Sequence, residues 1–412
     1  MKISKENIEI FLVFLLFIVS CFHPMSLYFS LIIGLIYLFK GYIGLFKLMF
    51  LLILRTNISP GIFFDISDLQ IFQIFKWIII IVGSVVVIVF QTIKIKKIDN
   101  IIIFILIISL YFAVTSLFYS NNISLSMLKI TSYVLPLLAF YSSREIIQSK
   151  NLKGWINKIL ILSLIMSLTL IFTNVGYLRN GHGFQGIFNN PNMLGIISVI
   201  SFGLNYTLTN DKKMKFFYLL LYFFVVIISE SRTSLLSMFV LMLIFLFFLE
   251  NKKIIKLLNL ILCLLIGILI GLSNFRNSII AFFQKGQQST DILHSRDGQL
   301  ESLKIVLRES PIFGKGFGVP VMTNPINIDS TIVEAGNLFI ALIMFGGIFG
   351  LVLFMFFIFY WLKFININYI GIFLSTLLIC MGEMVLFSSN SIGLWCSLLW
   401  VISLDRSRNK LT

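Results

Sequence analysis

Long apolar segments alternate with short polar ones along almost the whole chain, a pattern typical of a protein that crosses a membrane many times. We predict membrane-spanning helices at 7–22, 25–39, 41–55, 71–90, 100–118, 127–141, 156–174, 191–208, 216–229, 232–249, 254–272, 336–362, 369–389 and 391–404. Several are shorter than the ~20 residues of a helix perpendicular to the bilayer, so broken or re-entrant helices are expected. The predicted fold is all-α, a single polytopic membrane domain (1–412) with about fourteen transmembrane helices, the range being roughly ten to fourteen.

The composition excludes a soluble protein. Hydrophobic residues make up 58% of the 412 residues, and the mean hydropathy is +1.01. A water-soluble chain of this length could not bury so much apolar surface, so lipid is the solvent for most of it. The four cysteines all lie in apolar segments, where they are typical packing residues, and they show neither a disulfide framework nor zinc spacing.

The net charge of +15 would suggest a nucleic-acid partner for a soluble protein, but the positions of the charges suggest membrane topology instead. Basic clusters separate pairs of apolar segments; they are Lys94–Lys97, Arg144–Lys158, Lys212–Lys215, Lys252–Lys256 and Arg406–Lys410. Short basic loops stay on the cytoplasmic side of a membrane. We therefore predict that these clusters and both termini are cytoplasmic, and we expect no nucleic-acid partner.

On this topology the polar stretch 273–335 is a large extracytoplasmic loop, and 175–190 is a second outer segment. The large loop contains Gly314–Gly318, which superficially resembles a phosphate-binding loop. It lacks the Walker pattern and follows no predicted strand, so we interpret it as a compact turn that brings the chain back to the membrane. A membrane protein with one large hydrophilic loop is expected to carry its chemistry there.

Several arginines lie on the predicted outer side, against the usual charge bias; they are Arg179, Arg232, Arg276, Arg296 and Arg308. A guanidinium matches phosphate oxygens and stays charged, so such a group suits a pyrophosphate-linked lipid. Arg276 and Arg308 are better explained by snorkelling to lipid headgroups. Arg232 follows Glu230 at the apex of a predicted hairpin, and the pair is either a structural contact or part of an anion site.

The remaining candidates are acids and histidines on the same side. Asp297, Glu301 and Glu334 are possible acceptors for a proton, and His182 or His294 is either a general base or a surface residue. Asn189–Asn192 predicts a turn and a helix start, and Glu383 lies within a predicted span. We find no His, Cys or carboxylate spacing for a metal site, and we predict no cofactor.

The second half of the chain resembles the O-antigen polymerase and ligase superfamily, and specifically Wzy-type polysaccharide polymerases. The resemblance covers about residues 180–355 and depends on motifs in a fixed order. These are Gly186–Gly195, Ser231–Arg232, Ser295–Arg296, Ser310–Gly318, Asn337–Leu338 and Phe345–Leu351.

The resemblance implies a metal- and nucleotide-independent membrane glycosyltransferase that acts on undecaprenyl-pyrophosphate-linked glycans at the outer face of the bacterial inner membrane. A polymerase would join lipid-linked repeat units into O-antigen or capsular polysaccharide, with membrane lipid, a flippase and a chain-length regulator as further partners. We assign Arg232, Arg296, Asp297 and Glu334 as candidate catalytic residues. The candidate substrate-binding residues are Arg179, His182, Asn192, His294 and Asn337.

Two other functions are considered. An O-antigen ligase of the superfamily is expected to carry a histidine just before the asparagine that ends the loop, whereas Gly336 precedes Asn337 here. A flippase for the same lipid-linked sugar should show repeated halves and short loops, but this chain has one large outer loop and no visible repeat.

Overall fold

The computed structural model describes residues 5–93, 99–178, 183–245, 247, 297–318 and 336–405. The helices are α1 (Lys5–Val19), α2 (Pro24–Gly34), η1 (Leu35–Lys40), α3 (Tyr42–Thr56), α4 (Gln70–Trp77), η2 (Ile78–Val82), α5 (Gly83–Thr92), α6 (Asn100–Tyr119), α7 (Ile123–Ser142), α8 (Arg144–Ser149), α9 (Leu152–Leu168), η3 (Asn174–Tyr177), α10 (Pro191–Leu208), α11 (Lys212–Ile228), α12 (Arg232–Ile244), α15 (Asp297–Glu309), α16 (Leu338–Leu362), η7 (Ile367–Tyr369), α17 (Ile370–Ile379) and α18 (Gly393–Ile402). Within these ranges the fold is all-helical, and the two β-bridges are isolated.

Four helical segments in the described ranges are long and apolar enough to cross a membrane: Gln70–Thr92, Asn100–Tyr119, Ile123–Ser142 and Leu338–Leu362. Large apolar side chains stay exposed on the surface, among them Phe39 and Phe172 at 91% and 97%. A surface of this kind is stable in lipid and not in water. The protein is therefore an integral membrane protein, while the full number of spans and the large outer loop remain predictions.

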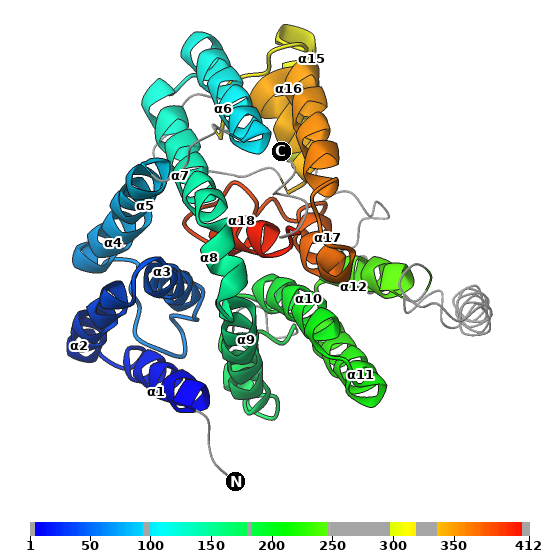
Figure 1. The fold of residues 1–412 in the computed structure, drawn as a ribbon. Helices are drawn as coiled ribbons and strands as arrows, with labels where there is room; N and C mark the ends of the chain where they lie inside the picture. The colour runs from blue at the N-terminus through cyan, green and yellow to red at the C-terminus, as the bar shows by residue number, and fades with distance from the viewer. Residues whose placement is uncertain are drawn as a thin grey trace, which may run out of the picture.

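The helices form neighbouring groups around α18 (Figure 1). Helices α10, α11, α12 and α17 pack together, and α6 and α7 pack together beside α16 and α15. Small residues allow the close approaches that such packing needs in a membrane. A Cβ on Gly203 of α10, for example, would lie 2.6 Å from the Ser375 hydroxyl of α17.

Polar contacts show which segments of the chain lie together at each end of the bundle. One end joins Asp99 to Arg144, with Nη2 3.0 Å from Oδ2, and Glu6 to Lys158. The other end joins the Ser59 amide to the Ile187 carbonyl. The first set contains residues predicted to be cytoplasmic and the second contains residues predicted to be outside, so the contacts match the predicted alternation. We call the second set the predicted outer end.

The last predicted spans differ from the structure. Residues 369–389 were expected to form one helix, but α17 ends at Ile379 and the chain has no regular helix until Gly393. Gly382 and the polar run Ser388–Ser391 interrupt the apolar pattern and favour turns. As a result, Glu383 lies after the helix and not inside a span.

Candidate active site at the predicted outer end

Arg232 opens α12 directly after a tight buried turn. Helix α11 ends at Ile228, whose carbonyl accepts a hydrogen bond from the Phe184 amide at 2.9 Å. Glu230 adopts a left-handed backbone with φ of 53°, which is uncommon for a residue with a side chain. Ser229 and Ser231 are buried on either side of Glu230. This turn fixes the position at which the Arg232 side chain leaves the backbone.

Arg232 places a cation at the first position of α12. Its Nε atom is buried and has no hydrogen-bond partner among them, and no ion pair within 4.0 Å joins Arg232 to Glu230. The Ser231 hydroxyl bonds to Ser234 at 2.8 Å and does not cap the helix. A cation at an uncapped helix N-terminus attracts anions. Glu230 acts on Arg232 electrostatically without forming an ion pair within 4.0 Å, and the anion site stays a prediction.

Asn192 lies close to this turn because α10 begins beside α12. Asn190 caps α10 by accepting a hydrogen bond from the Met193 amide at 2.7 Å, and a Cβ on Gly195 would lie 2.7 Å from the Ser231 Cβ. The Asn192 Nδ2 donates to the Glu383 carboxylate at 2.8 Å. Through this bond Glu383 adds a carboxylate to the candidate site.

The segment that carries Glu383 also contacts the start of α12. A Cβ on Gly382 would lie 2.3 Å from the Thr233 side chain, so the backbone at Gly382 and the first turn of α12 are in direct contact. Asn192, Glu383 and Arg232 are thus joined through one hydrogen bond and one close packing contact. Residues far apart in the sequence converge here at the starts of two helices.

Asn337 caps α16 at the same end. Its Oδ1 accepts from the amides of Phe339 and Ile340 at 2.9 and 3.3 Å, and its Nδ2 donates to the Met381 carbonyl at 2.5 Å. The side chain therefore holds α16 against the segment after α17. Its predicted contact with substrate remains a prediction, since these bonds leave one amide hydrogen available.

Helix α15 brings part of the large polar loop to this cluster. A Cβ on Gly336 would lie 2.9 Å from the Gln299 side chain, so the first turn of α15 adjoins the start of α16. Asp297 is the first residue of α15, but its side chain lies outside the described part. The other predicted site residues outside the described ranges are Arg179, His182, His294, Arg296 and Glu334.

The segment Pro311–Gly318, at the end of the predicted outer loop, packs among the helices. Gly314, Gly316 and Gly318 all have positive φ, as expected for a compact turn. However, the segment enters the bundle and Phe317 is buried at 2% exposure. The Phe317 amide donates to the Ser116 hydroxyl on α6 at 2.8 Å, and the Lys129 Nζ on α7 donates to the Gly318 carbonyl at 2.8 Å.

A break in α16 receives this re-entrant segment. Gly347 has a φ of 66° inside the helix, so neighbouring backbone groups lose their helical partners. The Met344 carbonyl accepts from the Lys315 amide, and the Ile348 amide donates to the Pro311 carbonyl, at 2.8 and 2.9 Å. Non-helical backbone in a membrane is tolerated where protein groups satisfy it. The break and the re-entrant segment are therefore one structural unit.

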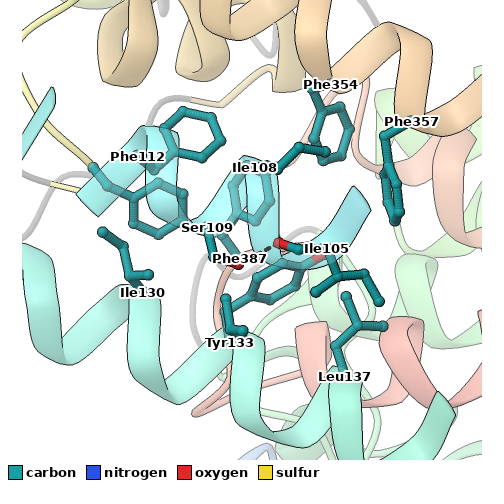
Figure 2. Close-up of a pocket in the computed structure, with 12 residues that line it drawn as sticks. Ile105, Ile108, Ser109, Phe112, Ile130, Tyr133, Leu137, Phe354, Phe357 and Phe387 are labelled. Carbon is teal, nitrogen blue, oxygen red and sulfur yellow. Dashed lines mark hydrogen bonds between the residues drawn. The ribbon is translucent and has the colours of Figure 1, made fainter. Parts of the chain in front are cut away.

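Phe317 lies beside an apolar cavity between α6, α7 and α16 (Figure 2). The rings of Phe112, Phe354 and Phe387 line it, and its volume is only about 30 Å³. A space that holds about one water molecule and is lined by apolar rings is a packing void. We assign it a structural role in seating the re-entrant segment.

The fold and this cluster define an integral membrane protein with a polar site at one end of a helical bundle. Residues 217–355 match the family model Wzy_C, which is described as O-antigen ligase. The match places this part of the chain in the O-antigen polymerase and ligase superfamily. It runs from α11 into α16 and includes Arg232, α15 and the re-entrant segment, whereas Asn192 and Glu383 lie outside it. No curated protein matches the chain.

Proposed function

We propose that this protein polymerises undecaprenyl-pyrophosphate-linked repeat units into O-antigen or capsular polysaccharide at the outer face of the inner membrane. The observation that carries the proposal is the position of Arg232. It lies within the matched region, at an uncapped helix start, with a buried Nε that has no partner among the described residues. This is the kind of group that a pyrophosphate leaving group needs.

The proposed reaction needs neither metal nor nucleotide. A hydroxyl at the sugar end of a new lipid-linked unit attacks the anomeric carbon of the growing chain. A C–O bond forms there, the C–O bond to the pyrophosphate breaks, and undecaprenyl pyrophosphate leaves with the electron pair. Arg232 and Arg296 would stabilise the charge that develops on the leaving group. Asp297, Glu334 or Glu383 would take the hydroxyl proton.

The choice of polymerase over ligase depends on Gly336. A ligase is expected to carry a histidine at this position, and glycine cannot replace its imidazole. The description of the matched family as O-antigen ligase keeps ligation as the second candidate. The match favours glycan transfer of either kind over transport by a flippase.

A deletion strain distinguishes these functions by a gel of its surface glycan. Loss of a polymerase should leave single repeat units on the surface acceptor, because export and ligation continue. The wild-type gene on a plasmid should restore the full ladder. A bare acceptor with lipid-linked polymer accumulating would identify a ligase, and a bare acceptor without such polymer would indicate a flippase.

A further inference from the structure

A polar cavity lies at the predicted outer end, lined by residues outside the region that matches the family. Its volume is about 460 Å³, and it is lined by the loop after α3, by α4, by the start of α10 and by the segment before α18. Cavities that hold small ligands have volumes of roughly 300–1,000 Å³. The polar lining residues include Asn57, Asn189, Asn390 and Ser391, which offer amide and hydroxyl groups suited to a sugar.

Two buried cations line this cavity. Arg55 is 3% exposed and Lys76 is 1% exposed, and neither forms an ion pair within 4.0 Å with a carboxylate in the described ranges. The one carboxylate among the lining residues belongs to Asp65, which is exposed and accepts from the Ser67 amide. Buried charges are costly unless they are paired or functional.

The contacts of these cations leave donors available. Arg55 Nη2 donates to the Phe64 carbonyl at 2.7 Å, and its Nε makes a longer contact of 3.4 Å with the Ser20 carbonyl. Lys76 Nζ donates to Gln73 Oε1 at 2.7 Å. These hydrogen-bond partners are all neutral. The exposed Asp65 carboxylate attracts Arg55 electrostatically from beyond ion-pair distance, so an anion in the cavity would supply the first negative charge in direct contact with the two cations.

Arg55 also lines a smaller apolar cavity between α1, α2, α3 and α4. Its walls include Val13, Leu31 and Phe72, and its volume is about 70 Å³. Phe72 of this cavity and Lys76 of the polar cavity are one turn apart on α4. A charged region and an apolar region therefore meet at Arg55, which suits a ligand with a phosphate head and a hydrocarbon chain.

We propose that this pair of cavities binds a lipid-linked phosphate, with the phosphate between Arg55 and Lys76 and the start of its chain in the apolar cavity. The site is separate from the Arg232 site. Asn189 and Met193 line the polar cavity, while Asn192 bonds to Glu383, so the two sites share the start of α10. We identify this ligand as the second lipid-linked substrate, bound in addition to the one at Arg232, and this identification rests on the proposed function.

The test measures binding to the full-length protein in detergent. The probes are farnesyl phosphate, farnesol and inorganic phosphate, and the readout is tryptophan fluorescence. Trp77 is a suitable reporter because its ring lies 5.9 Å from Lys76 Nζ, and Trp77→Phe identifies its share of the signal. Farnesyl phosphate should bind most tightly, and Lys76→Gln should weaken it at least about tenfold, as expected for the loss of a charged hydrogen bond.

Lys150→Gln is the matched control, because Lys150 is an exposed cation after α8 at the opposite end of the bundle. Lys76→Arg should retain binding, which guards against a folding defect in Lys76→Gln. Equal affinity for farnesol and farnesyl phosphate would overturn the phosphate site, and so would equal affinity of the Lys76→Gln and Lys150→Gln proteins. Inorganic phosphate that bound as tightly as farnesyl phosphate would overturn the lipid part.

The two proposals can fail separately. If the Lys76→Gln protein loses binding but the strain that lacks the gene does not show the polymerase phenotype, the lipid-phosphate site is supported and the proposed function is contradicted. If the Lys76→Gln protein binds farnesyl phosphate normally while the deletion strain accumulates single repeat units, the proposed function is supported and the lipid-phosphate site is contradicted.

Discussion

Arg232 is the residue on which the proposed chemistry depends most. Its backbone is fixed by the buried turn at Ser229–Ser231, and its Nε has no partner among the described residues. A fixed backbone places this cation at the start of α12, where it would need little reorganisation when charge develops on a leaving group. The neighbouring Asn192–Glu383 pair provides both an amide donor and a carboxylate at the same end.

We predict that Arg232→Ala abolishes polymer formation while the amount of protein in the membrane stays normal. Removal of one fixed donor to a developing charge commonly lowers the rate by ~10²–10³. Arg232→Lys should rescue poorly, because lysine keeps the charge but loses the planar fork of donors. The measurement is the length distribution of surface glycan in a deletion strain that expresses each variant.

Lys150→Ala provides the control for charge removal, since this exposed lysine belongs to a basic cluster that is predicted to be cytoplasmic. Full-length polymer from the Arg232→Ala protein would remove Arg232 from the site. The same experiment applies to Arg296→Ala, for which we expect the same loss of polymer.

At the scale of elements, the break in α16 and the re-entrant segment stabilise each other. A helix of this length would ordinarily satisfy its own backbone groups. Here Gly347 interrupts it, and the backbone at Pro311 and Lys315 supplies the replacement partners. The Tyr111 hydroxyl on α6 donates to the Gly346 carbonyl at 2.6 Å, so α6 also holds the break in place.

We predict that Gly347→Ala lowers the melting temperature of the purified protein and disturbs polymer formation. A Cβ at this position would lie 2.1 Å from the Ile312 carbonyl oxygen, and the positive φ of 66° adds strain of ~1–3 kcal/mol. The measurement is thermal unfolding in detergent, followed by tryptophan fluorescence.

Gly298→Ala is the matched control, because Gly298 lies in α15 and a Cβ there would meet nothing within 4 Å. It should melt at or slightly above the temperature of the natural protein, since alanine favours helix over glycine. If the Gly347→Ala protein had the same melting temperature as the Gly298→Ala protein, the break would not be required for stability.

At the scale of the whole molecule, the two ends of the bundle differ in the residues that they join. Asp99 pairs with Arg144, and Glu6 pairs with Lys158, at one end. The loop after α3 contacts the segment before α10 at the other. The contacts establish which segments share an end. The positions of the lysine clusters predict which end faces the cytoplasm.

We predict that a membrane-impermeant thiol reagent labels Asp68→Cys but not Lys213→Cys in spheroplasts. Both positions are exposed in the structure, and the native Cys21, Cys380 and Cys396 are buried. Permeabilised cells should show labelling at both positions, which controls for accessibility. Labelling of Lys213→Cys alone in intact spheroplasts would reverse the orientation and place the candidate site on the cytoplasmic side.

The sequence by itself determined that lipid surrounds most of this protein, and it predicted where many of the helices lie along the chain. Apolar segments and basic clusters depend on local composition, so helices such as Asn100–Tyr119 and Leu338–Leu362 lie close to their predicted ranges. The ordered motifs likewise predicted the superfamily, which the match at 217–355 confirms. Asn190 and Pro191 also predicted the start of α10 correctly, because capping is a local property.

Only the tertiary structure decided which residues meet. The Asn192–Glu383 pair and the re-entrant segment at Gly347 join parts of the chain that are far apart, and no local pattern encodes such contacts. Arg55 and Lys76 were also missed, although cations at the edges of apolar segments were the signal available. Their role depends on the groups that surround them. Folding alone places both of them, buried and without an ion pair within 4.0 Å in the described ranges, on the wall of one cavity.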